Sequence, residues 1–147
     1  MMNTMKLNGI HTLILFIGLV LSLVACNKNS PVPEDNPQEQ RLELLSKTWN
    51  IENGSIRLDG ADVSANYQGF KITFRDGNFS TEGAGELFPT SGTWAWIDNA
   101  ATMIKTGRGK EMNLVAINDS ELVLSFYKSN ENAVTGAVGN YEIKLNP

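Results

Sequence analysis

The one thiol of this chain is the residue whose type and position most clearly point to chemistry. Cys26 is the only cysteine, and it follows an apolar run, Leu13–Val24, with one small residue, Ala25, between them. A single basic residue, Lys6, precedes the run. A short basic start, an apolar centre and a small residue at the end are typical of a secretory signal peptide. The run is too short for a membrane span, which needs roughly 20 apolar residues. Residues 1–25 are therefore predicted to be a cleaved signal peptide, and the Cys26 thiol an attachment point.

The four residues Leu23-Val24-Ala25-Cys26 resemble the lipobox of bacterial lipoproteins. The resemblance implies cleavage between Ala25 and Cys26, a diacylglycerol on the thiol, and an acyl chain such as palmitate on the new amino terminus. Two or more acyl chains hold a protein on a membrane far more firmly than one. We expect a lipid-anchored protein of the cell envelope, on the outer membrane, facing either the periplasm or the cell surface.

The mature chain offers little catalytic chemistry. Its only histidine, His11, lies in the predicted signal peptide. Without a histidine or a free thiol, the chain lacks the usual base at neutral pH and the usual zinc ligands. Glu82 and Glu86 suggest the carboxylate pair of a glycosidase, but a glycine-rich loop does not fix the separation that such a pair needs. We expect no enzyme, no metal and no cofactor.

Charge argues against a nucleic-acid partner. Lys6 is the only charged residue before Cys26, so cleavage leaves 16 acidic residues against 11 basic ones (12 less Lys6), a net charge of −5. Nucleic acids are bound mainly by neutralising phosphates with Lys and Arg. The segment Thr106-Gly107-Arg108-Gly109-Lys110 is similar to a phosphate-binding loop, but it lacks the spacing and the following Ser or Thr. We interpret it as a hairpin turn.

The mature chain begins with a tether and a short helix. Residues 26–36 are polar, contain prolines and show no period, which predicts an extended tether. Asn36 is a typical N-cap, and Pro37 suits the first position of a helix. The apolar residues that follow share one helical face: Leu42, Leu45 and Trp49.

From Trp49 to the end of the chain the apolar period is two, which predicts strands that are wet on one face. The Asp76-Gly77 pair predicts a tight hairpin. Strands are expected at 49–58, 70–75, around Phe79, and at 91–97, 101–106, 112–118, 121–126 or beyond, and 140–146. Eight sequential strands with hairpin connections predict an all-β domain at 37–147, a small antiparallel up-and-down barrel with one short N-terminal helix. A two-layer sandwich is the alternative.

Several segments of this domain resemble the lipocalin-like lipoprotein domains of Bacteroidota. They are LSKTW at 45–49, ITFRDGNF at 72–79, SGTWAW at 91–96, and the stretch 114–124. True lipocalins carry Gly-x-Trp at the first strand, and here Lys47 occupies the glycine position, so the resemblance is to the looser lipocalin-like group. It covers residues 40–147 and implies a small barrel that takes an apolar or amphipathic ligand.

Three aromatic residues are candidates for ligand binding: Trp94, Trp96 and Phe88. The tryptophans fall on one face of one strand, either as core packing or as a stacking platform for a sugar or lipid. Phe88 follows Leu87 in the glycine-rich loop 81–89, which is either a gate or an ordinary hairpin loop. An eight-stranded barrel is wide enough to be filled by side chains or to hold one small molecule, and the many large residues favour a filled interior.

Two binding functions remain open at this level. The first is a lipid-anchored protein that holds a small apolar or amphipathic ligand in the barrel mouth, without catalysis. The second is a packed barrel that binds another envelope protein or a glycan through its outer face or loops, and it predicts an exposed apolar patch.

Overall fold

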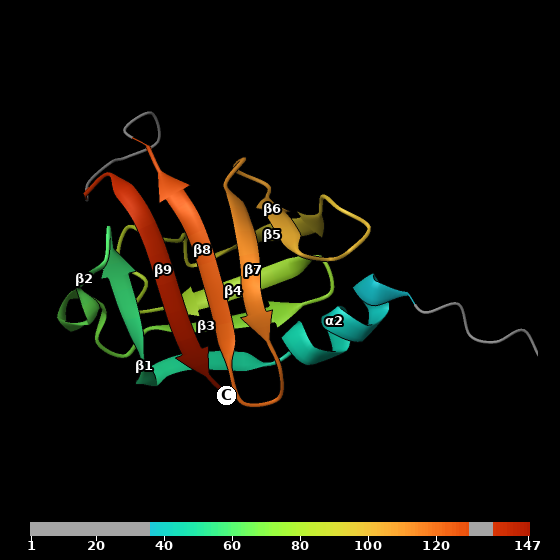
Figure 1. Cartoon of the computed structure of the whole chain (residues 1–147), viewed down its shortest axis with the longest axis horizontal. Coiled ribbons are helices and arrows are strands. Elements are labelled where there is room, and N and C mark those ends of the chain that lie inside the picture. The colour runs from blue at the N-terminus through green and yellow to red at the C-terminus, as the bar shows by residue number, and fades with distance from the viewer. Residues whose placement is uncertain (1–35, 130–136) are drawn as a thin grey trace, which may run out of the picture. The chain divides into compact units, whose positions relative to one another are not determined.

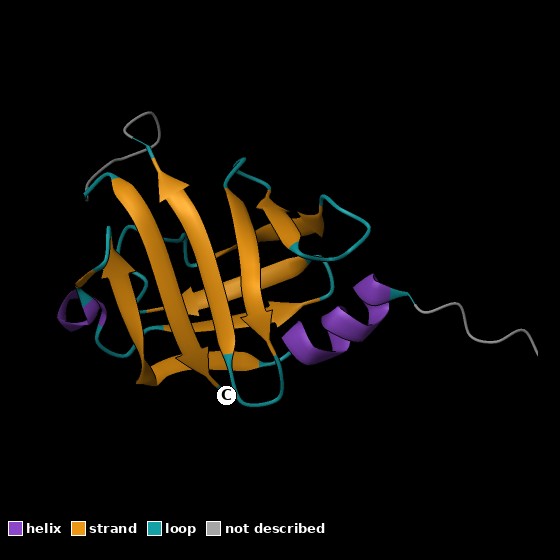
Figure 2. Cartoon of the chain, viewed as in Figure 1, coloured by secondary structure: helices purple, strands orange, loops and turns teal. Residues whose placement is uncertain are grey.

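The structure, a computed structural model of the chain, describes residues 36–129 and 137–147. The predicted signal peptide, Cys26 and the tether up to residue 35 lie outside the described residues. Figure 1 shows the arrangement of the elements and Figure 2 their secondary structure. In chain order the elements are α2 (Pro37–Leu45), β1 (Thr48–Leu58), β2 (Ala61–Asp62), the 3-10 helix η2 (Ser64–Tyr67), β3 (Lys71–Arg75), β4 (Asn78–Glu82), β5 (Ser91–Trp96), β6 (Met103–Thr106), β7 (Glu111–Ile117), β8 (Leu122–Lys128) and β9 (Gly139–Asn146).

The strands form one closed antiparallel barrel. Each strand from β3 to β9 pairs with the next, and β1 pairs with both β3 and β9, which closes the sheet on itself. Eight strands, β1 and β3–β9, make the barrel, while the two-residue β2 only extends one edge of β1. Closure removes the unpaired edges of an open sheet. The predicted all-β, eight-stranded barrel is confirmed, and it is the architecture that the lipocalin-like resemblance implies.

The first strand reaches both of its partners because it bends at a bulge. Its beginning pairs with β3 through Thr48–Asn50, whereas its end pairs with β9 from Ser55 on, with a register shift between Asn50 and Ser55. Gly54 lies in this shift, and a Cβ atom there would collide with the backbone carbonyl of Lys144. A bulge bends and twists a strand, so glycine at this position permits the barrel to close.

The helix begins as the sequence predicts. The Asn36 side chain accepts a hydrogen bond from the Gln38 N–H at 3.1 Å, and Pro37 occupies the first turn. The helix ends at Leu45, so Trp49 belongs to β1 and not to the helical stripe expected above. Its indole still joins the two elements, because Trp49 Nε1 donates to the Leu45 carbonyl at 3.1 Å.

Two turns show how side chains set the strand limits. The Asp76-Gly77 hairpin is confirmed between β3 and β4, with Gly77 at φ 67°. The sixth strand begins at Met103 and not at residue 101, because Ala101 lies at φ 55°, outside the strand region. The Asp98 carboxylate accepts the N–H groups of Thr102 at 3.0 Å and Met103 at 2.9 Å, which holds this turn in place.

A prediction follows for the Asp98 turn. The hydrogen bond from the Thr102 side chain, with others from backbone N–H groups, holds the pKa of the Asp98 carboxyl below its usual value. A lowered pKa stabilises the fold above the unfolded-state pKa, about 3.9, and this stabilisation is lost as the pH falls through the folded-state value. Asp98→Asn should therefore melt at a lower temperature than wild type at neutral pH, and the two melting temperatures should converge in acid.

Thermal denaturation between neutral pH and roughly pH 2 measures this difference. Asp119→Asn is the matched control, since the Asp119 side chain is 93% exposed in another turn. A gap between Asp98→Asn and wild type that stays constant over the whole pH range would contradict the assignment.

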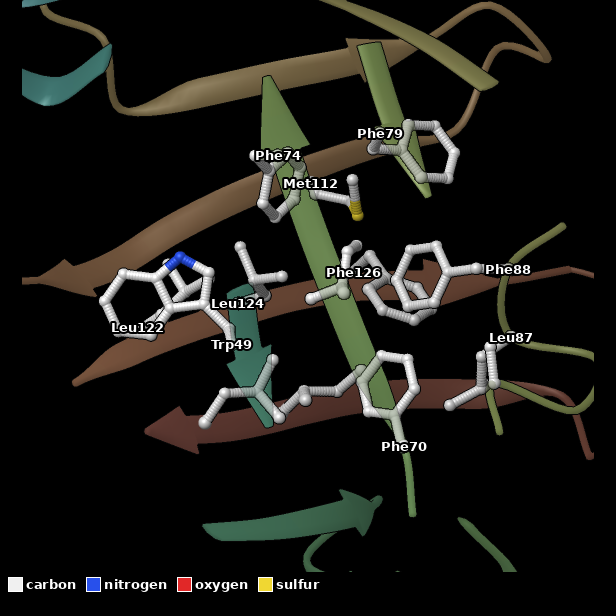
Figure 3. Close-up of a cluster of buried hydrophobic side chains, with 14 of the residues drawn as sticks. Trp49, Phe70, Phe74, Phe79, Leu87, Phe88, Met112, Leu122, Leu124 and Phe126 are labelled. Atoms are coloured by element: carbon white, nitrogen blue, oxygen red, sulfur yellow. The ribbon is translucent and has the colours of Figure 1, made fainter. Parts of the chain in front are cut away.

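The barrel interior is filled by large side chains, as Figure 3 shows for its central part. Phe74 packs edge-on against Trp94, with ring centroids 6.0 Å apart. Residues Asp35–Pro147 form one compact unit with its own core. The largest fully buried side chains are Trp49, Phe70, Phe74, Leu45, Ile56, Ile72, Leu87, Ile104, Met112, Leu122, Leu124 and Ile143.

Candidate functional site at the barrel mouth

A pocket of about 680 Å³ lies at one end of the barrel, outside the filled interior. We call this end the mouth; it is formed by the loop between β4 and β5, the turn between β6 and β7, and the end of β8. The pocket is lined by Gly85, Glu86, Leu87, Phe88, Pro89, Met103, Thr106, Arg108, Gly109, Lys110, Glu111, Asn113, Phe126, Tyr127, Lys128 and Ser129.

The pocket opens where two neighbouring strands separate. Strands β7 and β8 pair from Ile117↔Leu122 up to Asn113↔Ser125, and no pair joins them beyond that point among the described residues. Each strand nevertheless continues with its other neighbour, to Glu111 on β6 and to Lys128 on β9. Figure 1 shows the two strands diverging toward the mouth. The barrel wall is therefore split at this end, and pocket residues come from both sides of the split.

Two loop residues form the floor of the pocket. Leu87 and Phe88 are 1% and 4% exposed, although they belong to the glycine-rich loop. Phe88 stacks on Phe70 at 5.9 Å between centroids and meets Phe126 at 5.5 Å with a tilt of 69°. Figure 3 shows Leu87 and Phe88 beside Phe126 and Phe70. The loop closes this end of the core and gives the mouth an apolar base.

The loop is fixed to the barrel by its own hydrogen bonds and glycines. Thr81 Oγ1 donates to the Pro89 carbonyl at 2.8 Å, which ties the two ends of the loop together. Gly83 lies at φ 61°, and a Cβ there would come within 3.0 Å of the Gly69 backbone. The expected alternatives were a gate and an ordinary hairpin loop; in this structure the loop is a plug, with its apolar residues turned inward.

Lys110 is the cation nearest this floor. Its Nζ lies 4.2 Å from the ring centroid of Phe126 and 4.6 Å from that of Phe88, and it donates to the Leu87 carbonyl. Within residues 36–129 and 137–147, no carboxylate oxygen lies within 4.0 Å of this nitrogen. Burial, and then the positive charge of Lys128, lower the pKa of Lys110 to about 8.

Lys128 is the second buried amine of the mouth. It follows Leu122, Leu124 and Phe126 on the inward face of β8, and its side chain is only 7% exposed. Its Nζ lies 3.7 Å from Oε1 of Glu86, a residue of the plug loop. The pocket thus contains two enclosed amines beside one carboxylate.

Two uncharged phenols lie behind the aromatic floor. Tyr141 stacks on Phe126, with centroids 5.5 Å apart and planes within 14°. Burial, with a hydrogen bond to Tyr141, raises the pKa of the Tyr67 phenol. Tyr67 also lies under the loop, 3.4 Å from the point where a Cβ of Gly85 would be. Both rings extend the apolar surface without adding charge.

The structure separates the three predicted ligand-binding residues. Phe88 lines the pocket, whereas Trp94 and Trp96 do not. Trp94 is 5% exposed, and its Nε1 donates to the carbonyls of Arg75 at 2.9 Å and Asn78 at 3.0 Å. Trp96 meets Trp94 edge-on at 5.0 Å. The two tryptophans therefore pack with the core, the alternative that their spacing left open.

The two loop carboxylates do not converge. Glu82 lies 3.7 Å from Lys71 on the barrel surface, whereas Glu86 lies 3.7 Å from Lys128 in the mouth. In the described part of the chain, no group of three or more His, Cys, Asp or Glu side chains gathers as metal ligands would. The helices described there are also too short or too polar to cross a membrane.

Sequence reasoning missed both lysines of the mouth. Lys128 could have been found, because it continues the inward alternation of Leu122, Leu124 and Phe126 by one more step. Lys110 lies in the segment 106–110, which is similar to a phosphate-binding loop and was correctly interpreted as a hairpin turn, with Thr106 N–H donating to the Lys110 carbonyl at 2.8 Å. Nothing in that segment indicated that the lysine side chain would be enclosed.

Comparison of the chain with protein-family models, with curated proteins and with solved structures found no match.

Proposed function

We propose that this protein is a lipid-anchored binding protein of the cell envelope, with a lipocalin-like barrel whose mouth holds a small amphipathic ligand without catalysis. The observation that carries the proposal is the preformed pocket of about 680 Å³. Sites for small molecules commonly measure about 300–1,000 Å³ and combine apolar walls with a few polar groups. The mouth has an apolar floor and an adjacent set of charged side chains, so it fits that description.

The filled interior supports a ligand position in the mouth and not along the barrel axis. Leu87 and Phe88 block the way to the core, because both are buried among core residues. The apolar part of a ligand would lie on Phe88 and Phe126 and extend into the split beside Met103 and Tyr127. Tyr127 is 60% exposed, so this side chain is available to cover a bound molecule.

The lipid anchor is proposed from the sequence alone. Leu23-Val24-Ala25-Cys26 is similar to a lipobox, and the closed eight-stranded barrel that follows is consistent with the lipocalin-like fold that the sequence resemblance implies. We place the protein on the outer membrane through a lipid on Cys26. The face of the membrane is left open.

A second candidate function is an interaction module for another envelope protein or a glycan. The observation in its favour is that three large apolar side chains are exposed: Ile97, Val115 and Tyr127. Single exposed apolar residues are ordinary on protein surfaces. The pocket is therefore the stronger observation, and ligand binding is the preferred function.

Blocking the pocket tests the proposal. Asn113 lines the open side of the pocket and is exposed, so Asn113→Phe should fill that side without disturbing the core. We expect the mature chain, residues 26–147 made without the signal peptide, to bind an environment-sensitive apolar dye. The variant should bind the dye at least about tenfold more weakly, a loss of roughly 1.4 kcal/mol of binding free energy.

Ser80→Phe is the matched control, because Ser80 is also an exposed outward residue, on β4, and does not line the pocket. It should bind the dye as wild type does. Equal dye binding by wild type and Asn113→Phe would reject the mouth as the site and would favour the outer-face alternative.

A further inference from the structure

We propose that the ligand of the mouth is an amphiphile with an anionic head group, carboxylate or phosphate, held between Lys110 and Lys128. The inference rests on the proposed function, since it names the chemical class of the molecule that the pocket takes. Its basis is an imbalance of charge among enclosed side chains.

The first part of the imbalance is at Lys110. An enclosed ammonium group is costly unless an opposite charge compensates it. Here its contacts are a carbonyl, that of Leu87, and the faces of two rings, Phe88 and Phe126. These groups offer partial negative charge only, and cation–π contacts are weaker than a direct ion pair in an enclosed site. An anion in the pocket would supply the full opposite charge that the described residues do not place within 4.0 Å.

The second part is the neighbouring cation. Lys128 is close enough for its charge to lower the pKa of Lys110, so the two amines repel each other. Glu86 lies 3.7 Å from Lys128, which is longer than a direct hydrogen bond, and its side chain is 30% exposed. Lys110 is therefore enclosed beside a second cation, while Glu86 is paired with Lys128. A ligand anion between the amines would relieve their repulsion.

The remaining charged groups of the mouth do not correct the imbalance. Arg108 adds a third cation, and Glu111 adds a second carboxylate, whose Oε1 accepts from Lys105 at 2.9 Å on the outer face. The described lining of the pocket therefore has three cations and two carboxylates, in a chain whose formal net charge is −4. The phenols of Tyr67 and Tyr141 behind the floor contribute no charge. A local excess of positive charge on an acidic protein marks a site for an anion.

The position of the amines also orients the ligand. Lys110 Nζ lies over the same Phe88 and Phe126 rings that form the apolar floor. A head group bound at the two amines would leave its chain on that floor, with the split between β7 and β8 beside it. An apolar chain with a negative end satisfies both surfaces, whereas a neutral or cationic end leaves Lys110 without an opposite charge from the described residues.

The direction of the pH dependence follows from the same groups. The pKa of Lys110 in the free site is about 8, so this amine is mostly charged at neutral pH. A bound anion stabilises the charged form and raises its pKa. Above pH 8 the free protein must take up a proton to bind the anion, so affinity should fall as the pH rises between the free and bound pKa values. Affinity for a neutral amphiphile should not depend on pH in this way.

The experiment measures binding of matched ten-carbon amphiphiles to the mature chain by calorimetry. The probes are decanoate, decyl phosphate, decanol and decyltrimethylammonium. We expect either anion to bind at least about tenfold more tightly than decanol, and the cation to bind most weakly. A preference between the two anions identifies the head group. Lys110→Met and Lys128→Met should each remove most of the preference for anions while leaving decanol binding within about twofold.

Lys71→Met is the matched control, because Lys71 is an exposed lysine on β3, paired with Glu82 outside the pocket. It should keep the anion preference. If either mouth variant fails to fold, the wild-type pH profile decides: decanoate affinity should fall about tenfold between pH 7 and pH 10, and decanol affinity should stay flat.

The two proposals fail in different ways. If decanol and decanoate bind wild type equally, or if decanoate affinity does not change with pH, the anionic head group is wrong and the binding function stands. If no amphiphile binds wild type, both proposals are rejected.

Discussion

Trp49→Ala is expected to lower the free energy of unfolding by about 4 kcal/mol, because it removes the largest fully buried side chain of the barrel. The indole also joins two elements, since Nε1 donates to the Leu45 carbonyl at 3.1 Å at the end of α2. The Lys47 ammonium group lies over the indole ring, with Nζ 5.1 Å from the ring centroid. Alanine would leave a cavity and would remove one of the two hydrogen bonds that the Leu45 carbonyl accepts, the other being from the Lys47 N–H at 2.7 Å. Chemical denaturation of the mature chain measures the loss.

Trp96→Ala is the natural comparison for this variant. Trp96 is only partly buried and meets Trp94 at 5.0 Å, so its removal should cost roughly 1–2 kcal/mol. Trp49→Phe separates the two contributions at the first site, since it keeps a ring but loses the hydrogen bond, at a cost of about 1 kcal/mol. A loss below about 2 kcal/mol for Trp49→Ala would mean that the indole does not hold α2 against the barrel.

The fold was predictable because most strands are wet on one face. Alternation with period two marks each inward residue, as Phe70, Ile72 and Phe74 show on β3 and the residue before it. Once each strand has a defined inner face, sequential hairpins leave few arrangements besides a barrel or a sandwich. Local turn chemistry then fixes the connections, as at Asp76-Gly77. The period-two alternation and the turn residues were therefore the basis on which the barrel architecture was predicted.

The strand limits were less predictable because they depend on side-chain contacts that no period reveals. The start of β6 is delayed to Met103 by the carboxylate of Asp98, which accepts two backbone N–H groups. The helix stops at Leu45, although apolar spacing continues to Trp49, because the chain enters β1 after two residues. The first limit is set by local side-chain hydrogen bonds and the second by the neighbouring strand, and neither is visible in the apolar period.

The site was predictable only in part. Phe88 was a candidate because a large aromatic residue in a glycine-rich loop is unusual, and it does line the pocket. The amines escaped notice because charged side chains are almost never fully buried, so sequence reasoning assigns them to the surface. Lys128 is an exception to that rule because it lies on the inward face of β8. Lys110 is an exception because its turn brings the amine over the aromatic floor of the mouth. The alternation of apolar residues in β7 and in β8 does not indicate that the two strands separate.

Lys110 and Lys128 do not belong to the hydrophobic core of the barrel. Buried charges reduce stability unless they are compensated, and the core closes without them through Phe88, Phe126 and Leu87. Residues that are costly to the fold and directed toward a pocket are candidates for function. The free-energy cost of enclosing the two amines is thus consistent with an anionic ligand in the pocket.

Cys26→Ser is expected to abolish lipid attachment and to leave the barrel folded. Serine lacks the thiol that the diacylglycerol would occupy, and Cys26 lies outside residues 36–147, in which the core is built. Each CH₂ of an acyl chain contributes about 0.8 kcal/mol to membrane binding, so losing two or more chains should remove the anchor. Labelling cells with palmitate and measuring the intact mass of the purified protein report the lipid directly, whether or not the signal peptide is cleaved.

Ser30→Ala is the matched control, because it replaces a polar residue of the same predicted tether and leaves Cys26 unchanged. It should carry as much label as wild type. The melting temperature of the Cys26→Ser mature chain should equal that of the unmodified one, because the described core is formed by residues between Leu45 and Leu145. Palmitate label on Cys26→Ser equal to that on wild type would show that the lipid is elsewhere. A wild-type protein without label would reject the anchor, while leaving the pocket and its two amines as a separate question for the binding measurements.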